Sequence, residues 1–186
     1  MSGFSFDEFG AFDEPGGELN VIIETPKGSR NKFNFDPQRG VFKLGGVLPA
    51  GASFPFDFGF VPATLGQDGD PLDVLVLMDE AAFAGCLVPC RLIGVIEAEQ
   101  TERDGETMRN DRLIAVAANS HTHGEIKELT NLSRNLLDEI THFFKSYNEV
   151  KGKRFEMLHQ RGARAAEKLI HQGEKAFTGA KEASGG

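Results

Sequence analysis

The hydrophobic pattern of this 186-residue chain changes once, near residue 120, and that change limits the folds it can adopt. Before this point the apolar residues alternate or form short runs, as they do in β-strands. After it they recur every three or four residues over two segments, as they do in amphipathic helices. Many short strands followed by two helices predict an α+β protein, in which a small barrel or tightly curled sheet is flanked by helices.

Seven segments have the composition of strands or strand-like regions. They are residues 19–26, 31–37, 40–45, 53–66, 72–78, 86–99 and 112–118. The segment 72–78 has a continuous apolar run, so we expect it to be buried on both faces. In 53–66, four phenylalanines alternate with other residues from Phe54 to Phe60, which predicts one aromatic face. Two prolines in the same segment argue against a regular central strand.

Two segments near the end of the chain have helical periodicity. They are residues 132–150, which Asn131 or Ser133 could cap, and residues 162–177. A chain of this length fits a single domain of ordinary size, and 40% hydrophobic residues can supply its core.

Three parts of the chain can be distinguished by composition. Residues 1–18 are rich in glycine, phenylalanine and aspartate without a period, and we interpret them as a flexible arm. We expect residues 19–178 to form the folded domain and residues 179–186 to be a disordered tail.

The charge of the chain excludes one class of partner. The formal net charge is −8 and the sequence pI is about 5.2, which argues against binding to nucleic acid. A run of about 18 apolar residues is absent, so we expect no membrane association. The acidic N-terminus lacks the order of a signal peptide, and we expect a cytoplasmic location. Cys86 and Cys90 are expected to be buried free thiols.

The stretch "LGQDGDPLDVLVL" places Asp68, Asp70 and Asp73 directly before an apolar run. Carboxylates crowded this closely raise one another's pKa unless a cation neutralises them. Hard oxygen ligands suit Mg²⁺, Mn²⁺ or Ca²⁺. Gly69 lets the chain bend and Pro71 fixes the backbone, which favours a rigid loop that aims its carboxylates at one point. A solvated turn is the alternative interpretation.

This stretch resembles the Asp-x-Asp-Pro-x-Asp signature of family I soluble inorganic pyrophosphatases. Other segments resemble the same family in the same order; they are "VIIETP", "NKFNF", "FPFDFGFVPATLG", "RLIGVIE", "DRLIAVA" and "ITHFFKSYNEVKGKRF". The resemblance covers roughly residues 19–172. With it, the expected fold is α+β, with a small OB-like β-barrel of roughly five strands, additional strands and two C-terminal helices.

The resemblance implies Mg²⁺-dependent hydrolysis of inorganic pyrophosphate to two phosphates by a metal-activated water, with Mn²⁺ able to substitute. It implies a set of site residues: Asp70 and Glu24 as catalytic groups; Asp68, Asp70, Asp73 and Asp104 as metal ligands; Lys32, Arg112 and Tyr147 as substrate-binding groups. Asp70 would also receive the proton of the nucleophile, and Glu24 would hold a water on the metal. A homo-oligomer, and by resemblance a hexamer, is expected.

The polar turn at 101–111 leaves its acids open. Either Asp104, which we include among the ligands, or Glu102 could supply the first acid that the family carries there. Either Asn110 or Asp111 could stand for the second. Arg112 replaces a lysine of the family, which keeps the charge but changes the geometry.

Several positions depart from the family's pattern. Asn34 replaces a glutamate, Phe58 a tyrosine and Asn148 a lysine, while Gly45 and Gly46 stand near the place of an arginine. The metal-binding acids are therefore kept better than the groups that bind phosphate. Each charge-assisted hydrogen bond to phosphate contributes on the order of 1.5–3 kcal/mol.

Two hypotheses remain open from the sequence. The first is a working pyrophosphatase, or a hydrolase of another phosphoanhydride, in which Lys43, Arg109, Arg112 or a neighbouring subunit compensates for the lost cations. The second is a low-activity homologue that keeps the fold and metal site as a binding or scaffold subunit. The three aspartates favour the first hypothesis.

Overall fold

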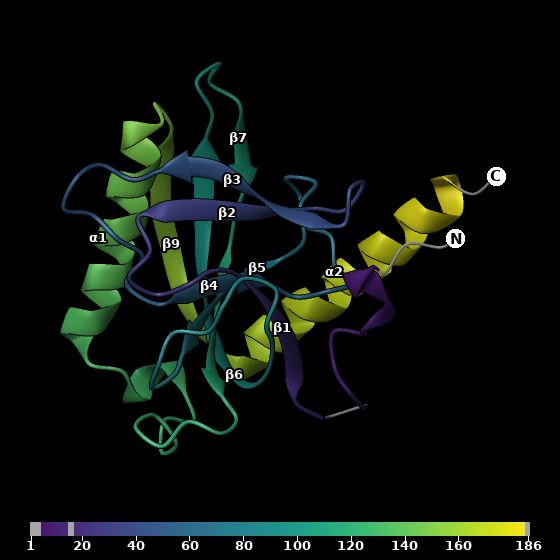
Figure 1. Ribbon diagram of the computed structural model, residues 1–186, viewed down its shortest axis with the longest axis horizontal. Helices are drawn as coiled ribbons and strands as arrows, with labels where there is room; N and C mark the ends of the chain where they lie inside the picture. The colour runs from purple at the N-terminus through teal and green to yellow at the C-terminus, as the bar shows by residue number, and fades with distance from the viewer. Residues whose placement is uncertain (1–4, 15–16, 185–186) are drawn as a thin grey trace.

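Five strands close into a ring in the computed structural model, which describes residues 5–14 and 17–184 (Figure 1). In ring order they are β1 (Leu19–Thr25), β4 (Asp57–Phe60), β5 (Asp73–Leu77), β8 (Arg112–Ala117) and β6 (Leu87–Thr101). β6 pairs again with β1, and this pairing closes the barrel. β5 and β8 run parallel, whereas the other neighbours in the ring are antiparallel. The expected small barrel is confirmed.

The additional strands lie outside this ring. β2 (Asn31–Asp36) and β3 (Val41–Val47) form a separate antiparallel hairpin, which crosses the barrel in Figure 1. β7 (Thr107–Arg109) and β9 (Arg154–Gly162) both pair with β6. The first part of the 15-residue β6 belongs to the barrel. Its last three residues pair with β7, and its pairing with β9 runs from Gly94 to Thr101.

β9 was not expected, because its sequence "RFEMLHQRG" lacks a regular alternation. Phe155 is the one buried residue in this strand. Its conformation therefore depends on pairing with β6 more than on burial of its own side chains, and such long-range pairing leaves little trace in local sequence. β7 was not predicted for the same reason: it lies within residues 101–111, which the sequence indicates as a polar turn, and it forms by pairing with β6.

Both expected helices are present near the end of the chain, although β9 lies between them in sequence. α1 (Arg134–Val150) is capped by Ser133, whose Oγ accepts the Leu136 N–H at 3.2 Å. Asn131, the other candidate cap, belongs to a short 3₁₀ turn, η2 (Leu129–Asn131). Among the described residues, no helix is both long enough and apolar enough to cross a lipid bilayer.

α2 (Ala163–Ser184) continues past residue 178, where the tail was expected to begin. The last residues of that tail, 185–186, lie outside the described residues. The two helices lie on different sides of the barrel (Figure 1).

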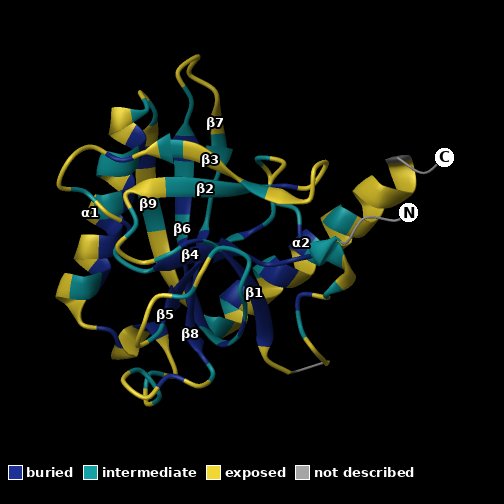
Figure 2. Cartoon of the chain, in the orientation of Figure 1, coloured by how far each residue is buried: buried dark blue, intermediate teal, exposed yellow. Residues whose placement is uncertain are grey.

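The strand β5 is buried on both faces, as its continuous apolar run predicts (Figure 2). Val74 and Val76 join the hydrophobic cluster that includes residues of α2. Leu75 and Leu77 join the cluster that includes residues of α1. The barrel wall therefore separates two apolar layers, and each helix completes one of them.

The alternating phenylalanines divide between two neighbourhoods. Phe54 and Phe58 join the cluster on the α1 side, their ring centroids 5.8 Å apart, and Phe56 packs against the same cluster. Phe60 instead lies 6.1 Å from the ring of Phe35 in the β2–β3 hairpin. The aromatic segment thus joins the barrel both to α1 and to the hairpin.

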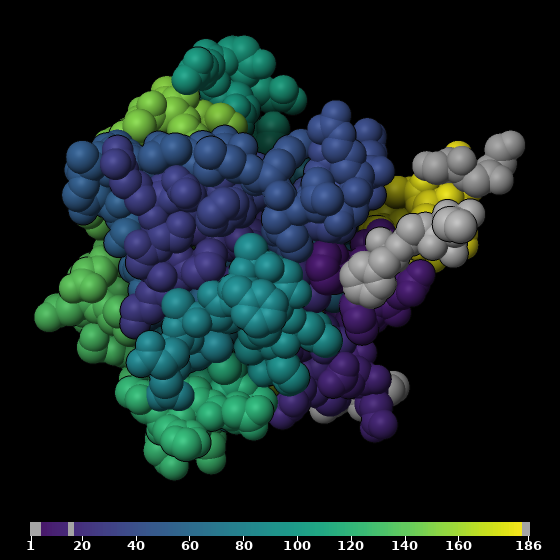
Figure 3. All heavy atoms as spheres, in the orientation of Figure 1, coloured from purple at the N-terminus to yellow at the C-terminus, as the bar shows by residue number. Residues whose placement is uncertain are grey.

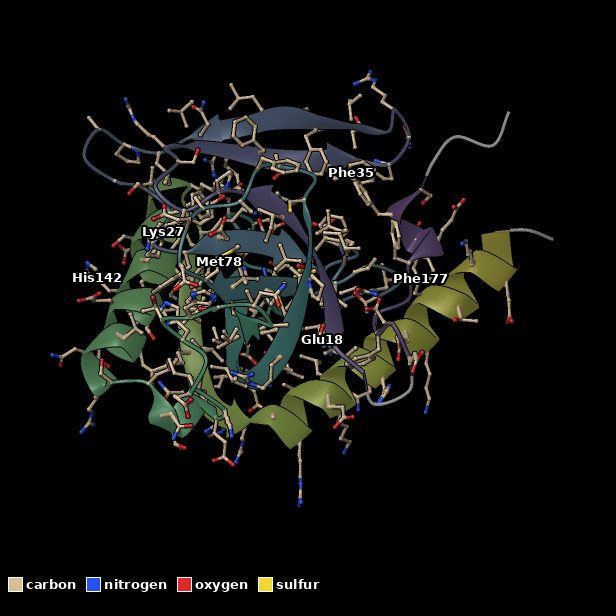
Figure 4. All side chains as sticks on the ribbon, turned by 60° about the horizontal axis from the view of Figure 1, so that its bottom comes forward. Glu18, Lys27, Phe35, Met78, His142 and Phe177 are labelled. Carbon is tan, nitrogen blue, oxygen red and sulfur yellow. The ribbon has the colours of Figure 1, made fainter. Side chains whose placement is uncertain are left out.

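The described part of the N-terminal arm packs against the body of the protein. The ring of Phe6, in the turn η1 (Phe6–Glu8), lies 4.7 Å from the ring of Phe35, which Figure 4 shows in the hairpin. The Asn20 side chain donates to the carbonyl of Gly10 at 3.0 Å. Residues 1–4 and 15–16 of the expected flexible arm lie outside the described residues. Both cysteines are free thiols; Cys90 is buried and Cys86 partly buried.

Asp57 in β4 is a fully buried carboxylate. Its Oδ1 accepts the Ala82 N–H at 3.0 Å, whereas its Oδ2 has no hydrogen-bond partner among the described residues. Burial raises the pKa of Asp57, so the folded state holds this proton more tightly than the unfolded chain does. Stability from this group is therefore complete at low pH and declines as pH rises through the raised pKa.

We expect Asp57→Asn to increase the free energy of unfolding at pH 7 by about 1 kcal/mol, because it removes a buried charge with an unpaired oxygen. The gain should shrink as pH falls toward the ordinary range of aspartate, where the wild type is protonated. Urea denaturation at pH 7 and pH 4.5 measures both values. A variant that is less stable than the wild type at both pH values would contradict this expectation.

Candidate active site

The parallel pairing of β5 and β8 brings Asp73 and Arg112 together at one end of the barrel. Val74 pairs with Leu113, so the residues that begin the two strands are neighbours. An Arg112 guanidinium nitrogen lies 2.6 Å from an Asp73 carboxylate oxygen. The Arg112 side chain is only 5% exposed, and its guanidinium also lies 5.0 Å from the ring of Phe144. A buried cation thus stands directly beside the aspartate loop.

The loop before β5 is held by hydrogen bonds that its backbone N–H groups donate within the loop. The Gly66 N–H donates to the carbonyl of Asp70 at 2.7 Å, and the Leu72 N–H donates to the Thr64 hydroxyl at 3.0 Å. Gly69 adopts a φ of +85°, a conformation that favours glycine. These contacts agree with the rigid loop that the sequence predicts.

The carboxylates of this loop influence one another. Burial, together with the charges of Asp73 and Asp70, raises the pKa of Asp68. Although Asp70 is exposed, partial desolvation and the charge of Asp73 raise its pKa, and Lys32 and Lys153 offset part of this effect. A bound cation would relieve both the repulsion and the desolvation.

The aspartates fit a hard divalent cation by donor type, since all three supply carboxylate oxygens. Across residues 5–14 and 17–184, however, no three acidic, histidine or cysteine side chains already stand as a group that could hold a metal ion. Convergence on a shared ion would therefore need rotation of these side chains. That convergence stays a prediction.

Glu24 and Lys32 form an ion pair between β1 and β2. The Lys32 ammonium lies 2.9 Å from Glu24 Oε2, and the Phe35 N–H donates to Glu24 Oε1 at 2.8 Å. Burial raises the pKa of Glu24, although Lys32 counters part of the shift. Lys32 also lies 4.4 Å from the ring centroid of Phe58. Phe58 thus supports the ammonium through its ring face, although it lacks the hydroxyl found in the resembled family.

Tyr147 lies near the C-terminal end of α1, and the Lys151 ammonium donates to its hydroxyl. Burial raises the pKa of Tyr147, while the charges of Lys32 and Arg112 lower it and that of Asp73 raises it. Groups from β2, β5 and β8, together with Lys151 directly after α1, therefore act on the same hydroxyl. The expected substrate-binding residues are brought into one site with the aspartate loop.

The two acids that the sequence leaves as alternatives, Glu102 and Asp104, both lie in the turn between β6 and β7, and their contacts differ. Asp104 is exposed, and its Oδ1 accepts the Glu106 N–H at 3.0 Å. Glu102 lies 2.8 Å from the Lys153 ammonium and accepts a hydrogen bond from Gln100 at 2.6 Å. Of the two acids, Glu102 is the one that pairs with Lys153, a cation that lowers the pKa of Asp70. Metal binding by Asp104 stays a prediction.

Asn110 and Asp111, the alternatives for the second acid, also differ in their contacts. The side chain of Asp111 is bound to Arg109 at 2.9 Å and accepts the Ala98 N–H at 2.8 Å. Asn110 accepts a hydrogen bond from Arg112 and donates to Gln100 at 3.2 Å. Asn110 is therefore the residue of this pair whose side chain contacts Arg112.

Of the three residues considered as compensation for the missing cations, Arg112 is the one placed beside the aspartate loop, and compensation itself stays a prediction. Lys43 pairs with Asp36 at 3.1 Å, and Arg109 pairs with Asp111, whereas Arg112 lies in the site. Beside Lys32, Gly46 leaves open space, since nothing lies within 4 Å of where its Cβ would stand.

Three further residues lie near the site: Gln100, Lys151 and Lys153. The sequence interpretation missed Gln100, and it placed Lys151 and Lys153 at a helix end, where cations favour the helix dipole. Lys151 follows Tyr147 by four positions, so helical periodicity could have placed both on one face. The contact of Lys153 with Glu102 could not be predicted, because it joins segments distant in sequence.

A cavity of about 310 Å³ adjoins the aspartate loop. Its wall includes Asp68, Asp73 and Asn110, together with Leu169 and Gln172 of α2. Lys32 and Tyr147 do not line it, so this cavity borders the site rather than containing it.

Comparison with known proteins gives a consistent family. Residues 21–178 match the family described as inorganic pyrophosphatase. The inorganic pyrophosphatase of Synechocystis sp. is 38% identical over 156 residues, which cover 84% of this chain and 89% of the relative. The solved inorganic pyrophosphatase from Thermus thermophilus has a TM-score of 0.85 at 30% identity, covering 94% of this chain and 99% of that one. The solved enzyme from Helicobacter pylori has a TM-score of 0.79 at 35% identity, covering 87% and 94%. This chain belongs to the inorganic pyrophosphatase family.

Proposed function

We propose that this protein hydrolyses inorganic pyrophosphate to two phosphates, with Mg²⁺ as its metal and Mn²⁺ as a substitute. The observation that carries the proposal is the meeting of two sets of charges. The Arg112 guanidinium lies 2.6 Å from the Asp73 carboxylate and the Lys32 ammonium lies 2.9 Å from Glu24, while the charge of Asp73 raises the pKa of Asp70 and Lys32 and Lys153 lower it. Carboxylates bind metal ions and cationic side chains bind a highly charged anion, so a site for both needs the two kinds of group close together. The family is metal-dependent, which agrees with this arrangement.

Asp68, Asp70 and Asp73 would hold the divalent ions through their carboxylate oxygens. When bound, such ions neutralise charge on the phosphates and lower the pKa of a coordinated water. Asp70, whose pKa partial desolvation raises, is suited to receive the proton of the attacking water. Glu24 would hold a water on the metal.

The cations and Tyr147 would act on the phosphates. Lys32 and Arg112 can donate charge-assisted hydrogen bonds to phosphate oxygens. Their positions are fixed before substrate arrives, Lys32 by Glu24 and Arg112 by Asp73. Preorganised donors of this kind stabilise charge that develops in the transition state. Tyr147 would add its hydroxyl to one of the same oxygens.

A low-activity scaffold subunit is not favoured. Arg112 keeps a buried cation beside the aspartate loop, and the metal-binding acids remain. Asp104 as a fourth ligand, a homo-oligomeric (hexameric) assembly and a cytoplasmic location remain predictions.

Phosphate release from pyrophosphate tests the proposal. With excess Mg²⁺ we expect turnover on the order of 10 s⁻¹ or more, a lower but measurable rate with Mn²⁺, and none in EDTA. ATP and polyphosphate in parallel reveal a changed substrate. A protein that releases phosphate from none of these substrates with either metal would sink the enzymatic proposal.

A further inference from the structure

The helix residue that follows Tyr147 is turned away from the site. Asn148 is 2% exposed, and its side-chain amide donates to the carbonyl of Phe144 at 2.8 Å. It therefore cannot reach a ligand beside Tyr147. The next residue on the same helix face is Lys151, one turn later, and its ammonium contacts the Tyr147 hydroxyl.

Lys151 is partly buried among other cations. Its ammonium lies 4.0 Å from the centroid of the Tyr147 ring. Burial and the charges of Lys153 and Arg112 lower its pKa. Within residues 5–14 and 17–184, no carboxylate forms an ion pair with it, since Glu102 pairs with Lys153. A cation held in this way is ready to bind an anion.

The β6–β7 turn holds Lys151 in place. The Arg103 guanidinium donates to the carbonyl of Lys151 at 2.7 Å, and Glu102 pairs with Lys153 at 2.8 Å. Gly152 adopts a φ of +73°, which lets the chain reverse after α1. Figure 3 shows the two turns in contact at the top of the molecule. Two segments far apart in sequence thus form one polar unit beside Tyr147.

We propose that Lys151 is a substrate-binding residue whose ammonium binds a phosphate group of the substrate over the face of Tyr147. Arg103 is a positioning residue that fixes Lys151 from the neighbouring turn. The inference rests on the proposed function and deepens it, because it adds a phosphate ligand outside the expected set. The long polar turn between β6 and β7 then has a role in substrate binding.

Binding of methylenediphosphonate, which cannot be hydrolysed at its P–C–P bridge, tests this directly. Isothermal titration calorimetry with excess Mg²⁺ compares the wild type with Lys151→Met, Lys151→Arg and Lys145→Met. We expect Lys151→Met to weaken binding about 10- to 100-fold, the loss of one charge-assisted contact. Lys151→Arg should retain most of the affinity. Lys145 is exposed on α1, so Lys145→Met should match the wild type.

The role of Arg103 is tested by a double-mutant cycle. Arg103→Gln should weaken diphosphonate binding by a factor of about 3–10, because Lys151 loses its anchor. In combination with Lys151→Met it should cause little further loss. In pyrophosphate hydrolysis, Lys151→Met should raise KM more than it lowers kcat, as expected for binding kept through the transition state.

Three results would overturn the inference. They are wild-type affinity in Lys151→Met, full additivity of the two substitutions, and no diphosphonate binding by the wild type. A wild type that binds the diphosphonate but does not hydrolyse pyrophosphate would instead refute the proposed activity and leave the assignment of Lys151 standing. Circular dichroism of each variant establishes that it is folded.

Discussion

Asp70→Asn is expected to lower the rate of pyrophosphate hydrolysis about a thousandfold at saturating Mg²⁺. The substitution keeps the shape of the side chain but removes its charge and its ability to accept a proton. General base catalysis alone contributes about 10²- to 10⁴-fold, and a weakened metal site adds to the loss. The rate of phosphate release at several Mg²⁺ concentrations measures the effect.

Loss of folding is not expected to explain this result. The Asp70 side chain is exposed, and partial desolvation and the charge of Asp73 raise its pKa, so removal of its charge should not destabilise the fold. Without metal, the variant should therefore be at least as stable as the wild type in urea. Asp138→Asn, at an exposed position of α1, is the matched control and should keep full activity. Activity of Asp70→Asn within tenfold of the wild type would remove Asp70 from the mechanism.

Arg112→Met is expected to lower the free energy of unfolding by about 3 kcal/mol in EDTA. Removing one member of a buried ion pair leaves the other uncompensated, at a cost of about 3–5 kcal/mol. The lower end applies because Asp73 is 23% exposed and water can partly solvate it. Methionine fills much of the space beside Phe144, so the lost charge should dominate over any cavity. Urea denaturation measures the difference.

Two comparisons sharpen this test. Arg39→Met breaks an exposed pair with Asp36 at 3.5 Å and should change stability by less than about 1 kcal/mol. Mg²⁺ should restore part of the stability of Arg112→Met, because a divalent cation can take the place of the guanidinium beside Asp73. Equal stability of the Arg39 and Arg112 variants would show that the Asp73–Arg112 pair contributes little.

The sequence was sufficient for those parts of the site that depend on short-range spacing. Asp68 and Asp70 lie in one loop whose turn residues predict its shape, and Asp73 begins β5, whose apolar run predicts how the loop is anchored. The hydrophobic alternation likewise predicts most of the barrel strands. These features are local in sequence, so they can be predicted from one amino-acid sequence.

The remaining parts depend on contacts between distant segments. Whether Glu102 or Asp104 faces the cations is decided by Lys153, about 50 residues later along the chain. β9 forms because the end of β6 offers it an edge, although its own sequence lacks alternation. The anchoring of Lys151 by Arg103 is of the same kind. Such pairings can be recognised only once the topology is known.

The parallel register of β5 and β8 has a consequence for how activity is acquired during refolding. A slip of one residue between these strands would shift Arg112 by about 3.3 Å and turn its side chain toward the opposite face. A collapsed but misaligned chain would then bury the same apolar residues and still lack the charge pair at the barrel end. Recovered turnover after dilution from denaturant would therefore report correct strand alignment, which regained secondary structure alone does not.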